Sequence, residues 1–153
     1  MRFREAGRDD LPAIVALLRD DDLGRGRKEA PLAAYQAAFD AIAASPADRL
    51  IVGVLGDRVV ACAQLTPIPG LSRGGSLRAQ VESVRVARDL RSAGLGAALM
   101  AQCEARACAA GCALIQLTTD RSRTAAHRFH ERLGYAPSHP GRRSRFDGGR
   151  PGR

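Results

Sequence analysis

The six residues from Arg91 to Gly96 have the composition of a turn that binds a diphosphate. They read Arg91-Ser92-Ala93-Gly94-Leu95-Gly96, after the apolar run 81–86 and at the start of a helical stretch, 95–110. A strand, a glycine turn and a helix in this order direct several backbone N–H groups, and the positive end of a helix dipole, at one point. Glycine at 94 and 96 lets a phosphate approach the backbone and allows positive φ. For so short a motif, an ordinary loop before a helix is the alternative.

Glu82 is the first candidate for a general base. Period-two alternation of the strand that contains it predicts one face with Glu82, Val84 and Val86. A carboxylate beside two valines on an inward face is partly desolvated, which raises its pKa toward the range useful for a base. The alternative is an ion pair with Arg78 or a solvated contact.

The histidines and cysteines lack the spacing of a metal site. His127 and His130 are three residues apart with no third ligand assigned, so a helix surface is the alternative to a metal pair. The four cysteines contain no C-x-x-C pair and are typical of reduced, buried thiols. We therefore expect no metal.

The elements that must position these residues follow from hydrophobic spacing and turn signals. We expect strands at residues 3–6, 50–55, 58–65, 77–87 and 113–118, one or two more strands within 135–146, and helices starting near Asp10, Pro31, Leu95 and Ser122. Gly56-Asp57 is a hairpin signal. Because a helix separates the strands at 77–87 and 113–118, these two should be parallel. The fold class is α/β (α+β) with a mixed sheet.

Length and composition favour one domain and exclude several functions. The chain has 153 residues and a formal net charge of +8, and its basic tail at 147–153 follows a domain at 1–146. With 4% aromatic residues and no tryptophan, the chain offers little for bases to stack on, so nucleic acid is an unlikely partner. No apolar run is long enough for a membrane, and no signal peptide is evident, so we expect a cytoplasmic protein.

Three motifs in sequence resemble the GNAT superfamily of acyl-CoA-dependent N-acetyltransferases. They are residues 81–86, Arg91-x-x-Gly94-x-Gly96, and residues 129–135. The resemblance covers about 1–146 and implies a sheet of about six to seven strands flanked by helices. This sheet would be splayed between its fourth and fifth strands, with acetyl-CoA in the gap.

The resemblance also implies roles for individual residues. Backbone groups of Val84, Arg85 and Val86 would bind the pantetheine arm, and Arg91, Ser92, Ala93, Gly94, Leu95 and Gly96 would bind the pyrophosphate. Many members place a glutamate at the position of Glu82. Where members often have a tyrosine acid after phenylalanine, this chain has His130, which either protonates the leaving thiolate or leaves that step to water. Asp21, Asp22 and His139 would lie on the acceptor side.

The expected function is transfer of acetyl from acetyl-CoA to a primary amine of a small molecule or peptide. A cationic small molecule is slightly preferred, because the acidic cluster at 20–22 stands where members bind acceptors. The alternative is a catalytically weak acyl-CoA-binding sensor or interaction module, which the histidine at 130 favours. A homodimer is compatible with either function.

Overall fold

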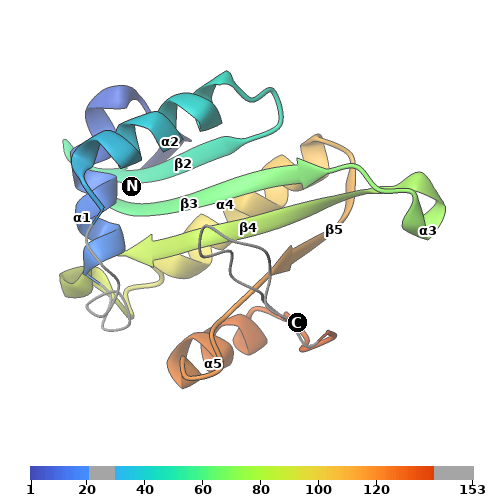
Figure 1. Cartoon of the computed structure of the whole chain (residues 1–153). Coiled ribbons are helices and arrows are strands. Elements are labelled where there is room, and N and C mark those ends of the chain that lie inside the picture. Colours follow the sequence, from blue (N-terminus) through green and yellow to red (C-terminus); the bar gives the residue numbers. More distant parts are fainter. Residues whose placement is uncertain (21–29, 140–153) are drawn as a thin grey trace, which may run out of the picture. The chain divides into compact units, whose positions relative to one another are not determined.

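A mixed sheet forms the frame of the first of two units, Met1–Leu117, and the second unit is Thr118–Arg153. The computed structural model describes residues 1–20 and 30–139. In these residues the strands are β1 (Arg2–Glu5), β2 (Arg49–Leu55), β3 (Arg58–Ile68), β4 (Leu77–Val86) and β5 (Cys112–Leu117), and their order across the sheet follows the chain (Figure 1). β1 to β4 are antiparallel neighbours. β5 runs parallel to β4, as the intervening helix predicted.

The described residues hold five strands, so the prediction of six to seven was wrong for this part of the chain. The missing strands were expected at 135–146. Residues 135–139, including His139, are not in a strand, and 140–146 lie outside the described residues. Pro137 lacks the backbone N–H that a strand contributes to its ladder, which explains why this segment does not pair.

The two main helix groups cover opposite faces of the sheet. α1 (Leu11–Arg19) and α2 (Leu32–Ala44) lie on one face, and α4 (Leu95–Ala109) lies on the other (Figure 1). α5 (Thr124–Arg132) belongs to the second unit. The remaining helical turns are η1 (Arg8–Asp10), α3 (Ser72–Gly75) and η3 (Arg88–Leu90). None of the helices in the described residues is both long and apolar enough to cross a bilayer.

The apolar spacing of the helices explains which side of each is buried. Ile14 and Leu17, one turn apart on α1, pack with Cys62 of β3 in one core cluster. Leu99 and Met100 of α4 are almost fully buried. α1 and α4 therefore pack on opposite faces of the central strands β3 and β4 (Figure 1).

An extra residue interrupts β4 where it passes β3. Glu82 pairs with Gln64 and Arg85 with Cys62, so two residues of β4 oppose one of β3, and Ser83 has φ +55. This is a β-bulge, which bends the strand and resets which side chains share a face. Residues paired across neighbouring strands have side chains on the same face of the sheet, and Gln64 and Cys62 are two residues apart on β3. Their partners Glu82 and Arg85 therefore lie on the same face of the sheet.

The bulge coincides with the end of the pairing between β4 and β5. The last register pair is Val81 with Leu117, the residue at which β5 ends, whereas β4 continues to Val86 (Figure 1). Within the described part of the chain, residues 82–86 therefore have β3 as a neighbour but not β5. One edge of this segment is left for another bonding partner.

Candidate active site

The glycine turn joins the open segment of β4 to the start of α4. Gly94 is the N-cap of α4 with φ 79, which confirms the predicted positive φ. Gly96 lies in the first turn of the helix, and the first helical bond of that turn runs from Ala98 N to Gly94 O at 3.1 Å. The N–H groups ahead of this bond have no partner inside the helix. They form an anion-binding end with the positive side of the dipole.

Ser92 also has positive φ, at 68, and this the sequence did not reveal. A serine in this conformation is uncommon, because its Cβ crowds the backbone. With Ser92 and Gly94 both left-handed, the chain reverses tightly between η3 and α4. Strained backbone of this kind is concentrated at functional sites.

The carbonyl groups along the open edge of β4 accept hydrogen bonds from arginine side chains. Arg85 Nη1 donates to Val84 O at 2.8 Å, and Arg91 Nε donates to Val86 O at 3.3 Å. Both carbonyls were predicted to bind an extended, amide-bearing arm. They are bonded to side chains here, so an incoming arm would compete with guanidinium groups rather than with a strand.

Asp20, at the end of α1, holds two arginines of the turn region. Its carboxylate accepts from Arg88 Nε at 3.1 Å and lies 3.6 Å from Arg91 Nη2, which also donates to Asp20 O at 3.1 Å. These three side chains are between 38% and 50% exposed, so water screens the pairs. Arg91 thus stands at the predicted diphosphate site with its charge partly compensated.

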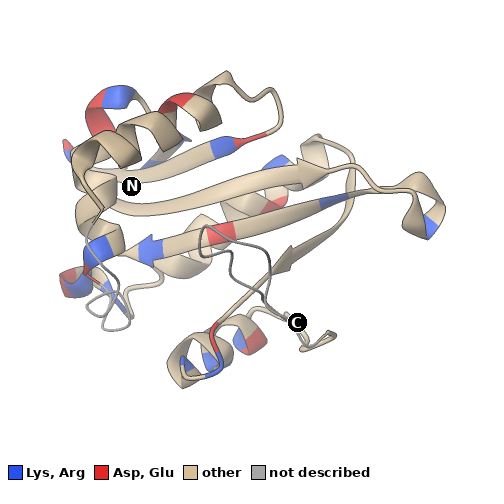
Figure 2. Cartoon of the chain, in the orientation of Figure 1, with Lys and Arg blue, Asp and Glu red and all other residues tan. Residues whose placement is uncertain are grey.

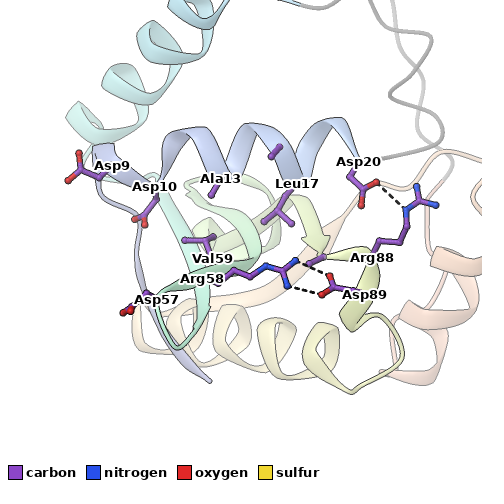
Figure 3. A pocket seen from close by; sticks show the side chains of 12 residues that line it. Asp9, Asp10, Ala13, Leu17, Asp20, Asp57, Arg58, Val59, Arg88 and Asp89 are labelled. Atoms are coloured by element: carbon purple, nitrogen blue, oxygen red, sulfur yellow. Dashed lines mark hydrogen bonds and ion pairs between the residues drawn. The ribbon is translucent and has the colours of Figure 1, made fainter.

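A hollow of about 730 Å³ runs beneath α1 and ends at the pair of Asp20 with Arg88 (Figure 3). Sequence reasoning did not find it. Its wall also holds Asp89, which Arg58 binds at 2.7 and 2.9 Å, and Asp10, which Arg4 binds. Three carboxylates on its wall, Asp10, Asp20 and Asp89, therefore have arginine partners.

Glu82 does not face inward with Val84 and Val86, so that part of the prediction was wrong. The bulge at Ser83 breaks the alternation, and Val86 pairs with Ala61 on the opposite face. Glu82 is exposed. β4 carries more charged residues than β2, β3 or β5, and Glu82 is its acid (Figure 2). The carboxylate is therefore accessible to solvent, one residue past the last pair of β4 with β5.

His130 lies on α5 in the second unit, between two aromatic rings. Its ring is edge-on to Phe129, with centroids 5.0 Å apart, and to Tyr135, at 5.8 Å. Nδ1 is buried and has no hydrogen-bond partner among the described residues. Burial, and then the positive fields of His127 and Arg123, lower the pKa of His130 below its ordinary 6.5. A mostly neutral imidazole follows at pH 7.

The remaining predicted residues fall into three groups. Asp21 and Asp22 lie outside the described residues. His139 is exposed, with Nδ1 3.0 Å from Ser138 Oγ. His127 Nε2 is 3.0 Å from Asp120 O, and residues 1–20 and 30–139 contain no group of three or more side chains that could hold a metal ion.

The chain is similar in sequence and in fold to known acetyltransferases. The model of the acetyltransferase (GNAT) family matches residues 11–135. A transcriptional regulator from Bacillus halodurans C-125 is 41% identical, with a TM-score of 0.90, over 95% of this chain and 99% of that one. A putative acetyltransferase from Agrobacterium tumefaciens str. C58 is 28% identical, with a TM-score of 0.85, over 95% and 100% of the two chains.

A more distant structure is similar in fold alone. An aminoglycoside N-acetyltransferase solved in complex with CoA has a TM-score of 0.80 at 17% identity, over 95% of this chain and 94% of that one. A search of curated proteins finds no match.

Proposed function

Because the chain belongs to the GNAT acetyltransferase family, we propose that it transfers an acetyl group from acetyl-CoA to a primary amine of a small molecule or peptide. The observation that carries this proposal is the bulge in β4 followed by the glycine turn and α4. Together they offer, in one stretch of chain, an anion-binding helix end and a strand edge that pairs with no other strand among the described residues. A relative with the same fold was solved with CoA, which supports the choice of donor.

The residues present fit this coenzyme. The N–H groups at the start of α4 would hold the diphosphate, and Arg91 would add a charge next to them. The edge from Val84 to Val86 would hold the pantetheine amides by strand-like bonding. When bound, acetyl-CoA supplies a thioester carbonyl that a neutral amine attacks.

Glu82 is the proposed base. An alkylammonium has a pKa of roughly 10.4, so only about one molecule in a thousand is neutral near pH 7.4. The exposed carboxylate of Glu82, one residue past the last pair of β4 with β5, accepts this proton directly or through a water. Arg85 lies on the same face of β4 as Glu82.

His130 is the proposed partner of the leaving sulfur. Its lowered pKa means that the imidazolium is a minority form at pH 7, so a neutral ring would donate one N–H as a hydrogen bond. Water would then complete the protonation of the thiolate, itself a stable leaving group. On the acceptor side, Asp21, Asp22 and His139 stay in the proposal.

A thiol-release assay with acetyl-CoA and a broad panel of amines tests this function. We expect turnover with at least one primary amine. Glu82→Gln should lower kcat/KM by roughly a hundredfold to a thousandfold at pH 7.4, because only the neutral amine then reacts. The deficit should shrink about tenfold per pH unit toward the pKa of the amine.

Glu104→Gln, an exposed acid on α4, is the matched control and should leave the rate unchanged. If Glu82→Gln matched the parent at every pH with a good substrate, Glu82 would not be the base.

The second candidate function is an acyl-CoA-binding sensor or interaction module. Two observations favour it: the 41% identical relative is named as a transcriptional regulator, and a histidine stands at 130 where the family often has a tyrosine. Tight CoA binding without thiol release above background, across the amine panel, would support this function over the enzyme.

A further inference from the structure

The sheet face that carries Glu82 changes from apolar to polar along β3. Val60 and Cys62 are completely buried beneath α1. Gln64 and Thr66 follow on the same face and are only half-buried. Among the described residues, the fully buried part of this face therefore ends at about the level of Glu82, and polar side chains line the sheet beyond it.

Three of these side chains form a row across neighbouring strands. Thr66 of β3 pairs in register with Gln80 of β4, and Gln80 pairs with Gln116 of β5. We call Thr66, Gln80 and Gln116 the amide row, after the side-chain amides of its two glutamines. Gln64 stands beside it, directly across from Glu82. Side chains directly opposite each other on neighbouring strands have Cβ atoms roughly 5 Å apart. Side chains two positions apart on the same strand are separated by roughly 7 Å.

Hydrogen bonds hold these side chains in place. Gln116 Nε2 donates to Gln80 Oε1 at 2.8 Å, and Gln80 Nε2 donates to Val81 O at 3.4 Å. A primary amide offers two N–H donors and an oxygen with two lone pairs. Each amide nitrogen uses one of its two N–H groups in these bonds. The glutamines of the row therefore keep N–H donors and oxygen lone pairs that a ligand can bind.

Asp48 fixes the other side of the row. Its carboxylate accepts from Thr66 Oγ1, and from Gln64 Nε2 at 3.3 Å. Donors to the charged form, with Thr66 the largest contributor, lower the pKa of Asp48. An ionised anchor sits behind Thr66 and Gln64, so both side chains are oriented before any substrate arrives.

We propose, on the basis of the proposed function, that the amide row recognises the acceptor and selects a primary amine whose neighbouring carbons carry hydroxyl groups. With the amine nitrogen at Glu82, groups a few bonds away would meet Gln64 and Gln80. Hydroxyl groups both donate and accept, and so replace the water on these amides. An apolar substituent would displace that water without making hydrogen bonds of its own, which would leave the polar groups of the row unpaired.

The test compares D-glucosamine with cyclohexylamine, with kcat/KM corrected for the neutral fraction of each amine. The parent should prefer the hydroxylated amine by roughly tenfold to a hundredfold, a moderate ratio because the row is part exposed. Gln80→Leu and Gln116→Leu should reduce this ratio to near unity, mainly through KM for glucosamine. The matched control, Gln36→Leu on exposed α2, should leave the ratio unchanged.

Two results would overturn the role of the row. One is a parent that uses cyclohexylamine as well as glucosamine, and the other is an equal loss with both amines in the leucine variants. Saturation-transfer NMR of both amines with the CoA-saturated protein provides a readout that needs no turnover. Failure of thiol release with every amine would refute the proposed function, whereas equal binding of both amines by parent and variants would refute the row.

Discussion

Alanine at position 94 should damage coenzyme binding, whereas the same change at position 111 should not. Gly94 and Gly111 flank the two ends of α4 and have φ of 79 and 78. A Cβ built on either meets nothing within 4 Å, so backbone conformation alone is at issue. An L-residue in the left-handed region costs about 1–2 kcal/mol.

The two substitutions should therefore cost similar stability. With an unfolding entropy of about 2.1 cal/mol/K per residue, a chain of 153 residues has about 0.32 kcal/mol/K, so 1–2 kcal/mol lowers Tm by about 3–6 °C in each variant. Calorimetric melting checks this part. Gly94→Asn should lose less, because asparagine tolerates the left-handed region.

Only the change at Gly94 should move the N–H groups that face the diphosphate. Loss of one hydrogen bond to a charged group costs about 1.5–3 kcal/mol, so Kd for CoA should rise roughly tenfold to a hundredfold in Gly94→Ala. Gly111→Ala should keep the parent Kd. Titration calorimetry measures both. Equal Kd values in the two variants, with equal losses of Tm, would refute the placement of the diphosphate at this turn.

Three further predictions concern single side chains. Asp20→Asn should tighten CoA binding by roughly twofold to tenfold at low salt and less at high salt, because it removes a negative charge beside Arg91 while the bond from Arg91 to Asp20 O remains. Weaker binding in titrations at both salt levels would instead make Asp20 a positioning residue. His130→Phe should lower kcat, because phenylalanine has no N–H to donate to the leaving sulfur, and His130→Tyr should retain or raise it. Because the pKa of His130 is lowered below 6.5, the neutral ring is the main form above that pH, so the advantage of the parent over His130→Phe should persist as pH rises above 7. Equal rates in all three proteins would remove His130 from the reaction. Asp10→Asn should lower the free energy of unfolding by about 1–2 kcal/mol near pH 7, a value discounted because Arg4 is 37% exposed. The hydrogen bond from Arg4 lowers the pKa of Asp10, so the difference in stability from the parent is full above about pH 4 and vanishes as pH falls through the folded-state pKa. Urea titrations of both proteins at pH 7 and pH 2 check this.

Local signals predicted most of the fold. Apolar spacing placed the helix that starts at Leu95, and Gly56-Asp57 correctly marked the hairpin between β2 and β3. The parallel pairing of β4 with β5 followed from the helix between them. These features depend on a few residues close together in the chain, and sequence patterns report such features well.

The details that decide the site were harder to predict. The bulge depends on Ser83 at positive φ, and serine carries no signal for that conformation. The contact of Asp20 with Arg88 joins residues far apart in sequence, and exposed arginines give no pattern that selects their partners. The prediction that Glu82 faces inward was wrong because of this bulge at Ser83.

The central claim is that main-chain N–H groups at the start of α4 bind the diphosphate of the coenzyme. Titration calorimetry of CoA against pantetheine, which lacks the diphosphate and the adenosine 3′-phosphate attached to it, tests it most directly when repeated with Gly94→Ala. The account predicts that CoA binds at least roughly tenfold more tightly, with the advantage lost in Gly94→Ala. Equal affinity for the two ligands, or no heat from CoA at millimolar concentration, would contradict it.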